Sequence, residues 1–372
     1  VIDGNNLYRT LHIRLALNKV DYYVPLCLDE FRGKDIKLPT HLNIDRSNGR
    51  GAQNEICWSK IKLSDTYSMI NVEKFRPEFH HTPTYAWMND PNGMFYLNGE
   101  WHLYYQYGPY GSMWNNMTWG HSVSRDLITW EHRADAIKPD ALGDIFSGSC
   151  VVDHNNTAGF GKGAVIALYT SAGDVQSQSL AYSTDGGNTF KKYEGNPILT
   201  ADIPDFRDPN MFWNEDIKAW NLILACGQEM RIYSSPDLKT WKEESRFGTG
   251  YGCHNGVWEC PDLIKLPVEG KKGAAAKSKW VLFCNINPGG PNGGSATQYF
   301  IGDFDGHKFT VDDESRYKPT VSASGEAKGG SLWQDYGKDH YATVSFSNAP
   351  NGRHTMIAWM SNWEYANDVP TT

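Results

Sequence analysis

Short apolar runs bounded by Gly, Asn, Asp and Pro recur along the whole chain, whereas helical periodicity is scarce. Runs of this length with turn residues at both ends are typical of β-strands. The clearest runs cover residues 101–107, 164–169, 220–226, 280–285 and 341–345. The pattern therefore predicts an all-β protein.

A short phrase with a turn-forming aspartate repeats between these runs. Its aspartates are Asp126, Asp185, Asp237 and Asp305, spaced by 59, 52 and 68 residues. Each phrase reads as a hairpin turn followed by an aromatic residue that begins the next strand. The spacing matches a four-stranded blade with a generous loop, and strand patterns after Lys328 add one more unit. We therefore expect a five-bladed β-propeller.

The two ends of the chain depart from this pattern. Residues 1–70 hold separate alternating runs and a loop rich in Gly, Asn and Arg, which predicts a small N-terminal β appendage before a propeller over residues 71–372. Residues 270–279 read as a surface loop. The end of the chain lacks the closing strand pattern that a ring favours, so we expect a separate or missing C-terminal module.

Composition and charge narrow the range of partners. Aromatic residues make up 13% of the chain, and their rings suit sugar faces, although most such rings pack sheets. A net charge of -8 without a Lys/Arg cluster argues against nucleic acid and anionic membranes as partners. No run of about 18 apolar residues predicts a membrane span, and no signal-peptide pattern opens the chain.

The seven cysteines are scattered without zinc-type spacing, and their odd number leaves at least one unpaired within the chain. They are Cys27, Cys57, Cys150, Cys226, Cys253, Cys260 and Cys284. We expect no disulfide framework, no metal and no cofactor. A metal-dependent hydrolase is disfavoured because His80 and His81 are adjacent and would point to opposite faces of a strand.

Three acidic residues stand in phrases unlike the repeat. Asp90 lies in Trp-Met-Asn-Asp-Pro-Asn-Gly, Asp208 in Phe-Arg-Asp-Pro-Asn and Glu259 in Val-Trp-Glu-Cys-Pro. Each has a proline within two residues, which restricts the local backbone. The asparagines beside Asp90 and Arg207 beside Asp208 favour ionised carboxylates, whereas the apolar neighbours of Glu259 favour its protonated form.

Two ionised carboxylates and one protonated acid suit glycoside hydrolysis, which needs a nucleophile, a stabiliser of the oxocarbenium-like transition state and a proton donor. The three acids are separated by 118 and 51 residues, so different blades carry them, and a propeller can aim them at one central funnel. Each phrase alone is also an ordinary turn sequence. The combination of all three favours a catalytic site.

These phrases, in this order on a predicted propeller, resemble glycoside hydrolase family 32 from about Phe75 to the end of the chain. The resemblance implies a five-bladed propeller, retention of anomeric configuration and a covalent fructosyl-enzyme. It makes Asp90 the nucleophile, Asp208 the transition-state stabiliser and Glu259 the acid/base. The residues expected to contact the terminal fructose are Asn89, Gln106, Trp114, Phe146, Ser147, Arg207 and Trp363. By this resemblance we expect the family's C-terminal β-sandwich to be missing from this chain.

The expected activity is the release of terminal fructose from sucrose or a longer fructose-containing saccharide, with the carboxyls of Asp90 and Glu259 roughly 5 to 5.5 Å apart. Two alternatives stay open: a fructosyltransferase with the same three acids, and a carbohydrate-binding propeller. The second is disfavoured because binding alone would tolerate Asn and Gln. The N-terminal strands look similar to those of gut-Bacteroidetes family members, which implies a secreted, periplasmic or cell-envelope location.

Overall fold

The computed structural model describes residues 2–3, 6–7, 32–33, 35–37, 76–109, 113–270, 278–321 and 327–368. The predicted N-terminal appendage therefore lies mostly outside the described residues, as does most of the predicted surface loop at 270–279. The described part of the appendage is an antiparallel sheet in the order β2-β1-β3. Its strands are β1 (Ile2–Asp3), β2 (Asn6–Leu7) and β3 (Ile36–Lys37).

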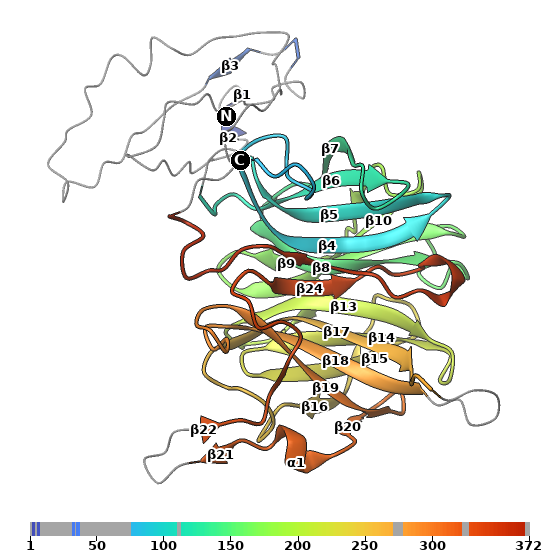
Figure 1. Ribbon diagram of the computed structural model, residues 1–372. Coiled ribbons are helices and arrows are strands. Elements are labelled where there is room, and N and C mark those ends of the chain that lie inside the picture. The colour runs from blue at the N-terminus through green and yellow to red at the C-terminus, as the bar shows by residue number, and fades with distance from the viewer. Residues whose placement is uncertain are drawn as a thin grey trace, which may run out of the picture.

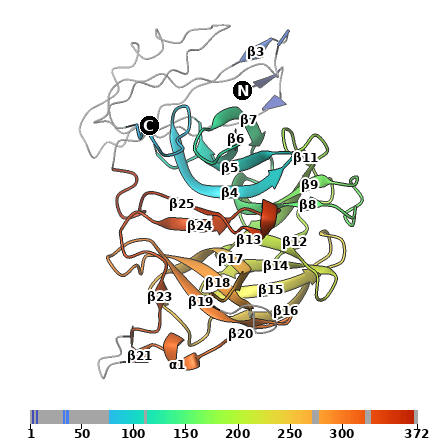
Figure 2. The ribbon, with the colours of Figure 1, turned by 45° about the vertical axis from the view of Figure 1, so that its right-hand side comes forward.

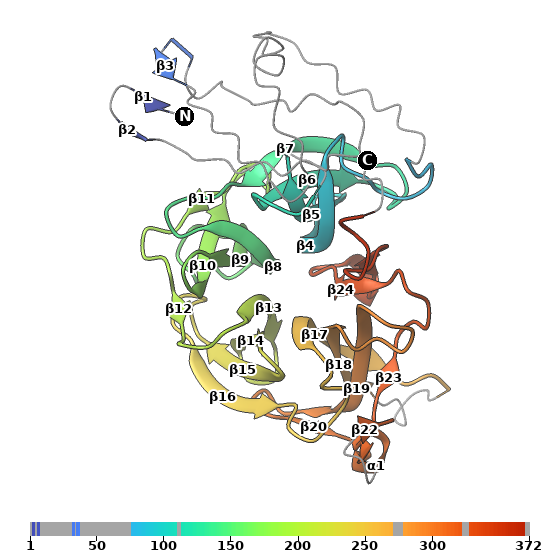
Figure 3. The ribbon, with the colours of Figure 1, turned by 90° about the vertical axis from the view of Figure 1, so that its left-hand side faces the viewer.

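Four antiparallel sheets are arranged around a ring as the blades of a propeller (Figure 3). The innermost strand of each blade is its first, namely β4 (Trp87–Leu97), β8 (Asp144–Asp153), β13 (Phe206–Asn214) and β17 (Val257–Pro267). The middle strands are β5 (Glu100–Gly108), β6 (Thr118–Ser124), β9 (Ala164–Ala172), β10 (Gln176–Ser183), β14 (Ala219–Cys226), β15 (Glu229–Ser235), β18 (Ser278–Asn287) and β19 (Ala296–Phe304). The outer strands are β7 (Glu131–Ile137), β11 (Lys191–Lys192), β12 (Leu199–Thr200), β16 (Lys242–Phe247), β20 (Phe309–Val311) and β23 (Leu332–Trp333).

The all-β prediction is confirmed. Among the described residues, the α-helical content is limited to α1 (Glu314–Tyr317), with a 3-10 turn at Pro350–Gly352. No helix in the described part of the chain is both long and apolar enough to cross a membrane.

The structure shows four blades rather than the five expected from the sequence. After β20 the chain forms α1, the short pair β21 (Thr320–Val321) and β22 (Ala327–Lys328), and then β23. The two strands that follow are β24 (Tyr341–Ser345) and β25 (Met356–Trp359), and among the strands that the structure describes they pair only with each other. This two-stranded ribbon lies between β4 and β17 (Figures 1 and 2). It lacks the turn phrase that joins the third and fourth strands of the other blades, so no four-stranded sheet forms there among the described residues.

The repeated aspartates have the structural role that their phrases predict. Each lies in the turn between the third and fourth strand of a blade, and its carboxylate accepts hydrogen bonds from backbone N–H groups two to four residues further on. These residues are Asp126, Asp185, Asp237 and Asp305. Such local bonds stabilise the turn without any help from the rest of the fold.

The core lies between neighbouring blades. Side chains of a strand alternate between its two faces, so β14 supplies both sides of its blade. Leu222 and Leu224 pack with the second blade, whereas Ile223 and Ala225 pack with the fourth. Because each blade is covered on both faces, its middle strands read as continuous apolar runs, which is the pattern found in the sequence.

Each strand that faces the centre of the ring is interrupted by an irregularity near its start. The pairing register shifts between Met88 and Pro91 in β4, Ile145 and Gly148 in β8, Arg207 and Asn210 in β13, Glu259 and Asp262 in β17, and Tyr341 and Val344 in β24. Such bulges re-aim side chains and are common next to active sites. All five lie at the same end of their strands, so they direct side chains to one end of the ring.

Candidate active site

The three acids of the sequence motifs lie within these irregular segments and meet around one cysteine. Asp90 belongs to β4, Asp208 to β13 and Glu259 to β17. The Cys260 sulfur lies 3.4 Å from Oδ2 of Asp90 and 3.6 Å from Oδ2 of Asp208. The backbone N–H of Cys260 also donates to Oδ2 of Asp208 at 2.9 Å. Residues separated by 170 positions in the chain therefore share one small space.

Asp90 is buried and bound on both carboxylate oxygens. Asn89 donates to its Oδ1 at 3.0 Å, and the Ser147 hydroxyl donates to its Oδ2 at 2.6 Å. Asn89 is itself fixed, because Trp87 donates its indole N–H to the Asn89 oxygen at 2.7 Å. The β4 and β8 blades thus hold the Asp90 carboxyl in one orientation.

The pKa values of the two aspartates are raised by effects that their sequence neighbours do not show. Burial raises the pKa of Asp90 above its usual value, and the nearby charge of Glu259 raises it further, while hydrogen bonds from Ser147, Asn89 and Cys260 lower it. Burial also raises the pKa of Asp208, against the opposing charge of Arg207. The local donors favour the ionised form of both groups, as their sequence neighbours predict, but the loss of hydration at the centre of the ring opposes them and raises both pKa values.

Glu259 is held by two hydrogen-bond donors rather than by apolar neighbours. The Arg207 guanidinium donates to Glu259 Oε1 at 2.9 and 3.2 Å, and the Tyr341 phenol donates to Oε2. Trp258, the apolar neighbour in sequence, points instead into the core between blades and is fully buried. Arg207 also bonds Asp205 and reaches Gln176 at 3.3 Å. The environment of Glu259 is therefore polar and charged, contrary to the prediction from its sequence neighbours.

Gln106 lies beneath Asp90 in a buried network. Its amide nitrogen donates to the Asn92 side-chain oxygen at 3.1 Å and to the Ile145 carbonyl at 3.0 Å, and Asn92 in turn donates to the Asp90 carbonyl at 2.8 Å. Gln106 is only 2% exposed. The Gln106 amide therefore links β4 of the first blade to β8 of the second through these hydrogen bonds.

The predicted aromatic residues gather into one wall. Trp114 contacts Phe146 edge to face with ring centroids 5.6 Å apart, and Trp363 stacks on Trp87 at 5.8 Å. Trp114 and Trp363 are themselves 6.5 Å apart. Because Trp87 bonds Asn89, this wall adjoins Asp90.

Two residues that contact the three acids, Tyr341 and Cys260, were not predicted as such from the sequence. Tyr341 begins a short strand with no recognisable motif, so its sequence offered no signal. Cys260 was noted only as a neighbour of Glu259, although its backbone and thiol bind the two aspartates. It is one of five cysteines in the described residues, all free thiols; Cys27 and Cys57 lie outside them.

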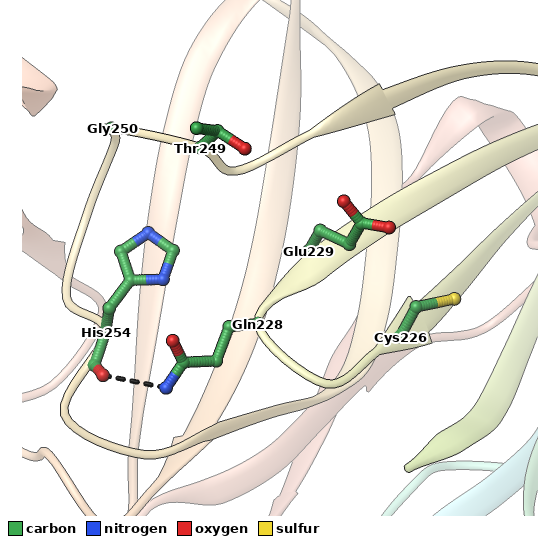
Figure 4. Close-up of a pocket in the computed structure, with 6 residues that line it drawn as sticks. All are labelled: Cys226, Gln228, Glu229, Thr249, Gly250 and His254. Atoms are coloured by element: carbon green, nitrogen blue, oxygen red, sulfur yellow. Dashed lines mark hydrogen bonds between the residues drawn. The ribbon is translucent and has the colours of Figure 1, made fainter. Parts of the chain in front are cut away.

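A hollow of about 450 Å³ opens beside the turn that joins β14 and β15 (Figure 4). Its walls are formed by Cys226, Gln228, Glu229, Thr249, Gly250 and His254. Gln228 donates to the His254 carbonyl at 2.8 Å and so connects this turn to the segment that leads from β16 into β17. None of the three acids lines this hollow. Within the described ranges, no group of three or more His, Cys, Asp and Glu side chains could hold a metal ion.

A propeller with three carboxyl groups brought together by its inner strands is a fold and site suited to glycosyl chemistry. The family model of the glycosyl hydrolases family 32 N-terminal domain matches residues 80–372. A second model, described as a domain of unknown function (DUF4980), matches residues 1–79. The chain therefore belongs to glycoside hydrolase family 32.

Several characterised proteins are similar to this chain. A levanase of Bacillus subtilis (strain 168) is 49% identical over 307 residues, covering 81% of this chain and 43% of the levanase. An extracellular exo-inulinase of Meyerozyma guilliermondii is 46% identical over 317 residues, covering 82% of this chain and 58% of the exo-inulinase. The chain thus spans about half the length of these curated relatives.

Solved structures are similar over most of the chain. The fructofuranosidase of Schwanniomyces occidentalis complexed with fructose has a TM-score of 0.71 and 43% identity, covering 80% of this chain and 56% of its own. The exo-inulinase of Aspergillus awamori has a TM-score of 0.72 and 38% identity, covering 81% of this chain and 62% of its own.

Proposed function

We propose that this protein is a retaining β-fructofuranosidase that hydrolyses terminal fructose from a fructose-containing saccharide. Asp90 is the nucleophile, Asp208 stabilises the transition state and Glu259 is the acid/base. The observation that carries the proposal is the meeting of the Asp90 and Asp208 carboxyls on the Cys260 sulfur, with Glu259 as the preceding residue. Relatives named levanase, exo-inulinase and invertase support the choice of fructose as the released sugar.

The reaction has two steps in this proposal. The Asp90 carboxylate attacks the anomeric C2 of fructose while the bond from C2 to the leaving oxygen breaks, and Glu259 gives its proton to that oxygen. Glu259 then takes a proton from water, the water oxygen bonds to C2, and the bond to Asp90 breaks. Asp208 lies beside both groups and offers negative charge to the cationic ring. The retaining assignment requires the carboxyls of Asp90 and Glu259 to lie roughly 5 to 5.5 Å apart, which stays a prediction.

The wall of Trp114, Phe146 and Trp363 provides an apolar face for the sugar ring in this proposal, and Asn89 and Ser147 orient the nucleophile. Glu259, Asp205 and Gln176 accept from four of the five N–H groups of Arg207, so its predicted contact with sugar hydroxyls requires the fifth.

We further infer that the β24–β25 ribbon takes the place of a fifth blade. It lies in the ring between the first and fourth blades and has the same register shift as the other central strands. The segment that joins its two strands is bound to the first blade, because Tyr96 donates its backbone N–H to the Ser347 carbonyl and Ser347 donates its backbone N–H to the Met94 carbonyl.

The division of the chain at residues 70 and 71 and a separate C-terminal β-sandwich module stay predictions. So does a location outside the cytoplasm, which the extracellular exo-inulinases among the relatives support.

Fructose release from sucrose, inulin and levan tests the proposed activity. Asp90→Asn is expected to lower kcat/KM by a factor of about a thousand or more, because the amide cannot form the covalent intermediate. Asp237→Asn, in a hairpin turn remote from the acids, is the matched control and is expected to keep the wild-type rate. An Asp90→Asn protein within tenfold of wild type would exclude Asp90 as the nucleophile.

A further inference from the structure

Tyr341 is a buried tyrosine whose hydroxyl touches the proposed acid/base. It is 1% exposed and begins β24. Its phenol lies in hydrogen-bond contact with Oε2 of Glu259, while Arg207 binds Oε1 of the same carboxyl at 2.9 and 3.2 Å. The two oxygens of Glu259 therefore have different partners, one on each side.

The fold holds Tyr341 in this position from several directions. The register of β24 shifts directly after Tyr341, and Ala342 has a φ of 53°, a left-handed conformation that is uncommon for a residue with a Cβ. The next residues are fixed to the fourth blade, since Thr343 donates its backbone N–H to the Asn285 oxygen at 3.1 Å and Ser345 donates to Asp262 at 2.7 Å. Strain of this kind persists where the surrounding structure specifies it, often at functional sites.

The two partners of Glu259 differ in the hydrogen bonds they can form. A guanidinium carries only donors, so the oxygen facing Arg207 must accept. A phenol can donate to a carboxylate and can equally accept from a protonated carboxyl. When Glu259 is ionised, Tyr341 donates to Oε2; when Glu259 is protonated, its proton belongs on Oε2 and the Tyr341 oxygen accepts it.

Tyr341 itself stays protonated through this cycle. Burial and the adjacent Glu259 carboxylate raise the pKa of Tyr341 well above its usual range. The charged and titratable groups around the Glu259 carboxyl are Arg207, Asp205, Asp208, Asp90, Cys260 and Tyr341. Among these groups, Tyr341 combines a direct bond to Glu259 with the ability to both donate and accept.

We propose that Tyr341 is a positioning residue that directs the Glu259 proton to Oε2 and accepts its hydrogen bond until the leaving oxygen takes the proton. This inference rests on the proposed function, since it assumes that Glu259 protonates the departing oxygen. The inference adds to the proposed function the group that decides which oxygen of Glu259 carries the proton.

The test compares two β-fructosides that differ in their need for a proton. Sucrose has a poor leaving group, whereas p-nitrophenyl β-D-fructofuranoside has one that departs with little protonation. Tyr341→Phe is expected to lower kcat/KM for sucrose by about tenfold or more, the effect of losing one hydrogen bond to a charged group. For the aryl fructoside, a fall within about threefold is expected. A merely structural role would lower both values alike, and equal losses would overturn the inference.

Two further variants sharpen the comparison. Tyr104→Phe is the matched control, because Tyr104 is equally buried and its hydroxyl donates to the Gly187 carbonyl at 2.6 Å, away from the acids. It is expected to leave the ratio of the two activities unchanged. In a Glu259→Gln background, Tyr341→Phe is expected to cause no further change in this ratio, because Tyr341 acts through Glu259. A further change there would contradict the inference.

The outcomes also separate this inference from the proposed function. If the wild-type protein releases no fructose from either substrate, the proposed function fails. If it is active and Tyr341→Phe lowers both activities alike, only the role of Tyr341 fails. Thermal unfolding establishes whether Tyr341→Phe is folded. If Tyr341→Phe does not fold, Tyr341→Leu, which also lacks the hydroxyl, is tested in its place. Failure of both variants to fold would overturn the assignment in favour of a structural role.

Discussion

Two histidines buried in the first blade make its stability depend on pH. His102 on β5 and His121 on β6 are 2% and 0% exposed, and their rings share a hydrogen bond of 3.1 Å between Nδ1 of His102 and Nε2 of His121. One nitrogen must donate and the other accept, so a second proton between the rings would place two N–H groups against each other. Burial lowers the pKa of His102 to about 4 and that of His121 to about 3, from a usual 6.5.

The direction of the effect follows from these values. Unfolding releases the histidines to water, where they take up protons below pH 6.5, whereas in the folded blade they stay neutral down to about pH 4. Their contribution to the free energy of unfolding is therefore fully present above pH 6.5 and is lost as the pH falls toward 4. At pH 5, one such histidine lowers the free energy of unfolding by about 2 kcal/mol. Whole domains have only about 5–15 kcal/mol, so the loss is measurable.

Urea unfolding of the wild type and of His121→Gln at pH 7.5 and pH 5 measures this contribution. The glutamine keeps a side-chain group for His102 but cannot titrate. We expect the wild type to be the more stable protein at pH 7.5 and its advantage to shrink by about 2 kcal/mol at pH 5. Asp262, whose pKa burial raises to about 6, changes stability with pH in the opposite direction, but it is present in both proteins and cancels.

An unchanged difference between His121→Gln and wild type would refute the reasoning, since it would mean that the buried ring is protonated as easily in the fold as in water.

Two further variants probe the site. Ser147→Ala removes a 2.6 Å hydrogen bond that lowers the pKa of Asp90. The acidic limb of the kcat/KM profile for sucrose should therefore move to higher pH, while the rate near neutral pH changes less. An acidic limb that stays in place would contradict this prediction. Gly294→Ala would place a Cβ 2.0 Å from the Asn362 side chain at a φ of +66°. The substitution should lower the free energy of unfolding by at least about 1 kcal/mol, which thermal unfolding measures. It should also raise KM more than it changes kcat, because Asn362 directly precedes Trp363, and steady-state kinetics measure this effect.

The features that the sequence predicted well depend on contacts between near neighbours. Asp126 and Asp237 form turns with residues two and three positions away, so their phrases are sufficient to place them. The continuous apolar run of β14 follows from its packing on both faces. The fifth blade was overcounted because strand patterns after Lys328 were read as a whole sheet, although in the described part of that segment β24 and β25 alone enter the ring.

The features that were missed depend on contacts across the ring. Burial raises the pKa of Asp90 and Asp208, whereas their sequence neighbours suggested easy ionisation. The apolar neighbour Trp258 turns away from Glu259, because successive side chains of a strand face opposite sides. The partner Tyr341 is 82 residues further along the chain.

The sequence by itself determined the strands, the turns between them and the three acidic motifs, because these depend on residue type and short spacing. The tertiary structure decided which oxygens of those acids face which donors, and how far each carboxyl is removed from water. Hydration and hydrogen bonding at the centre of a ring are set by side chains from every blade at once. The motif around Asp90 was therefore visible in the sequence, whereas the raised pKa of Asp90 and the bond from Tyr341 to Glu259 depend on contacts between blades.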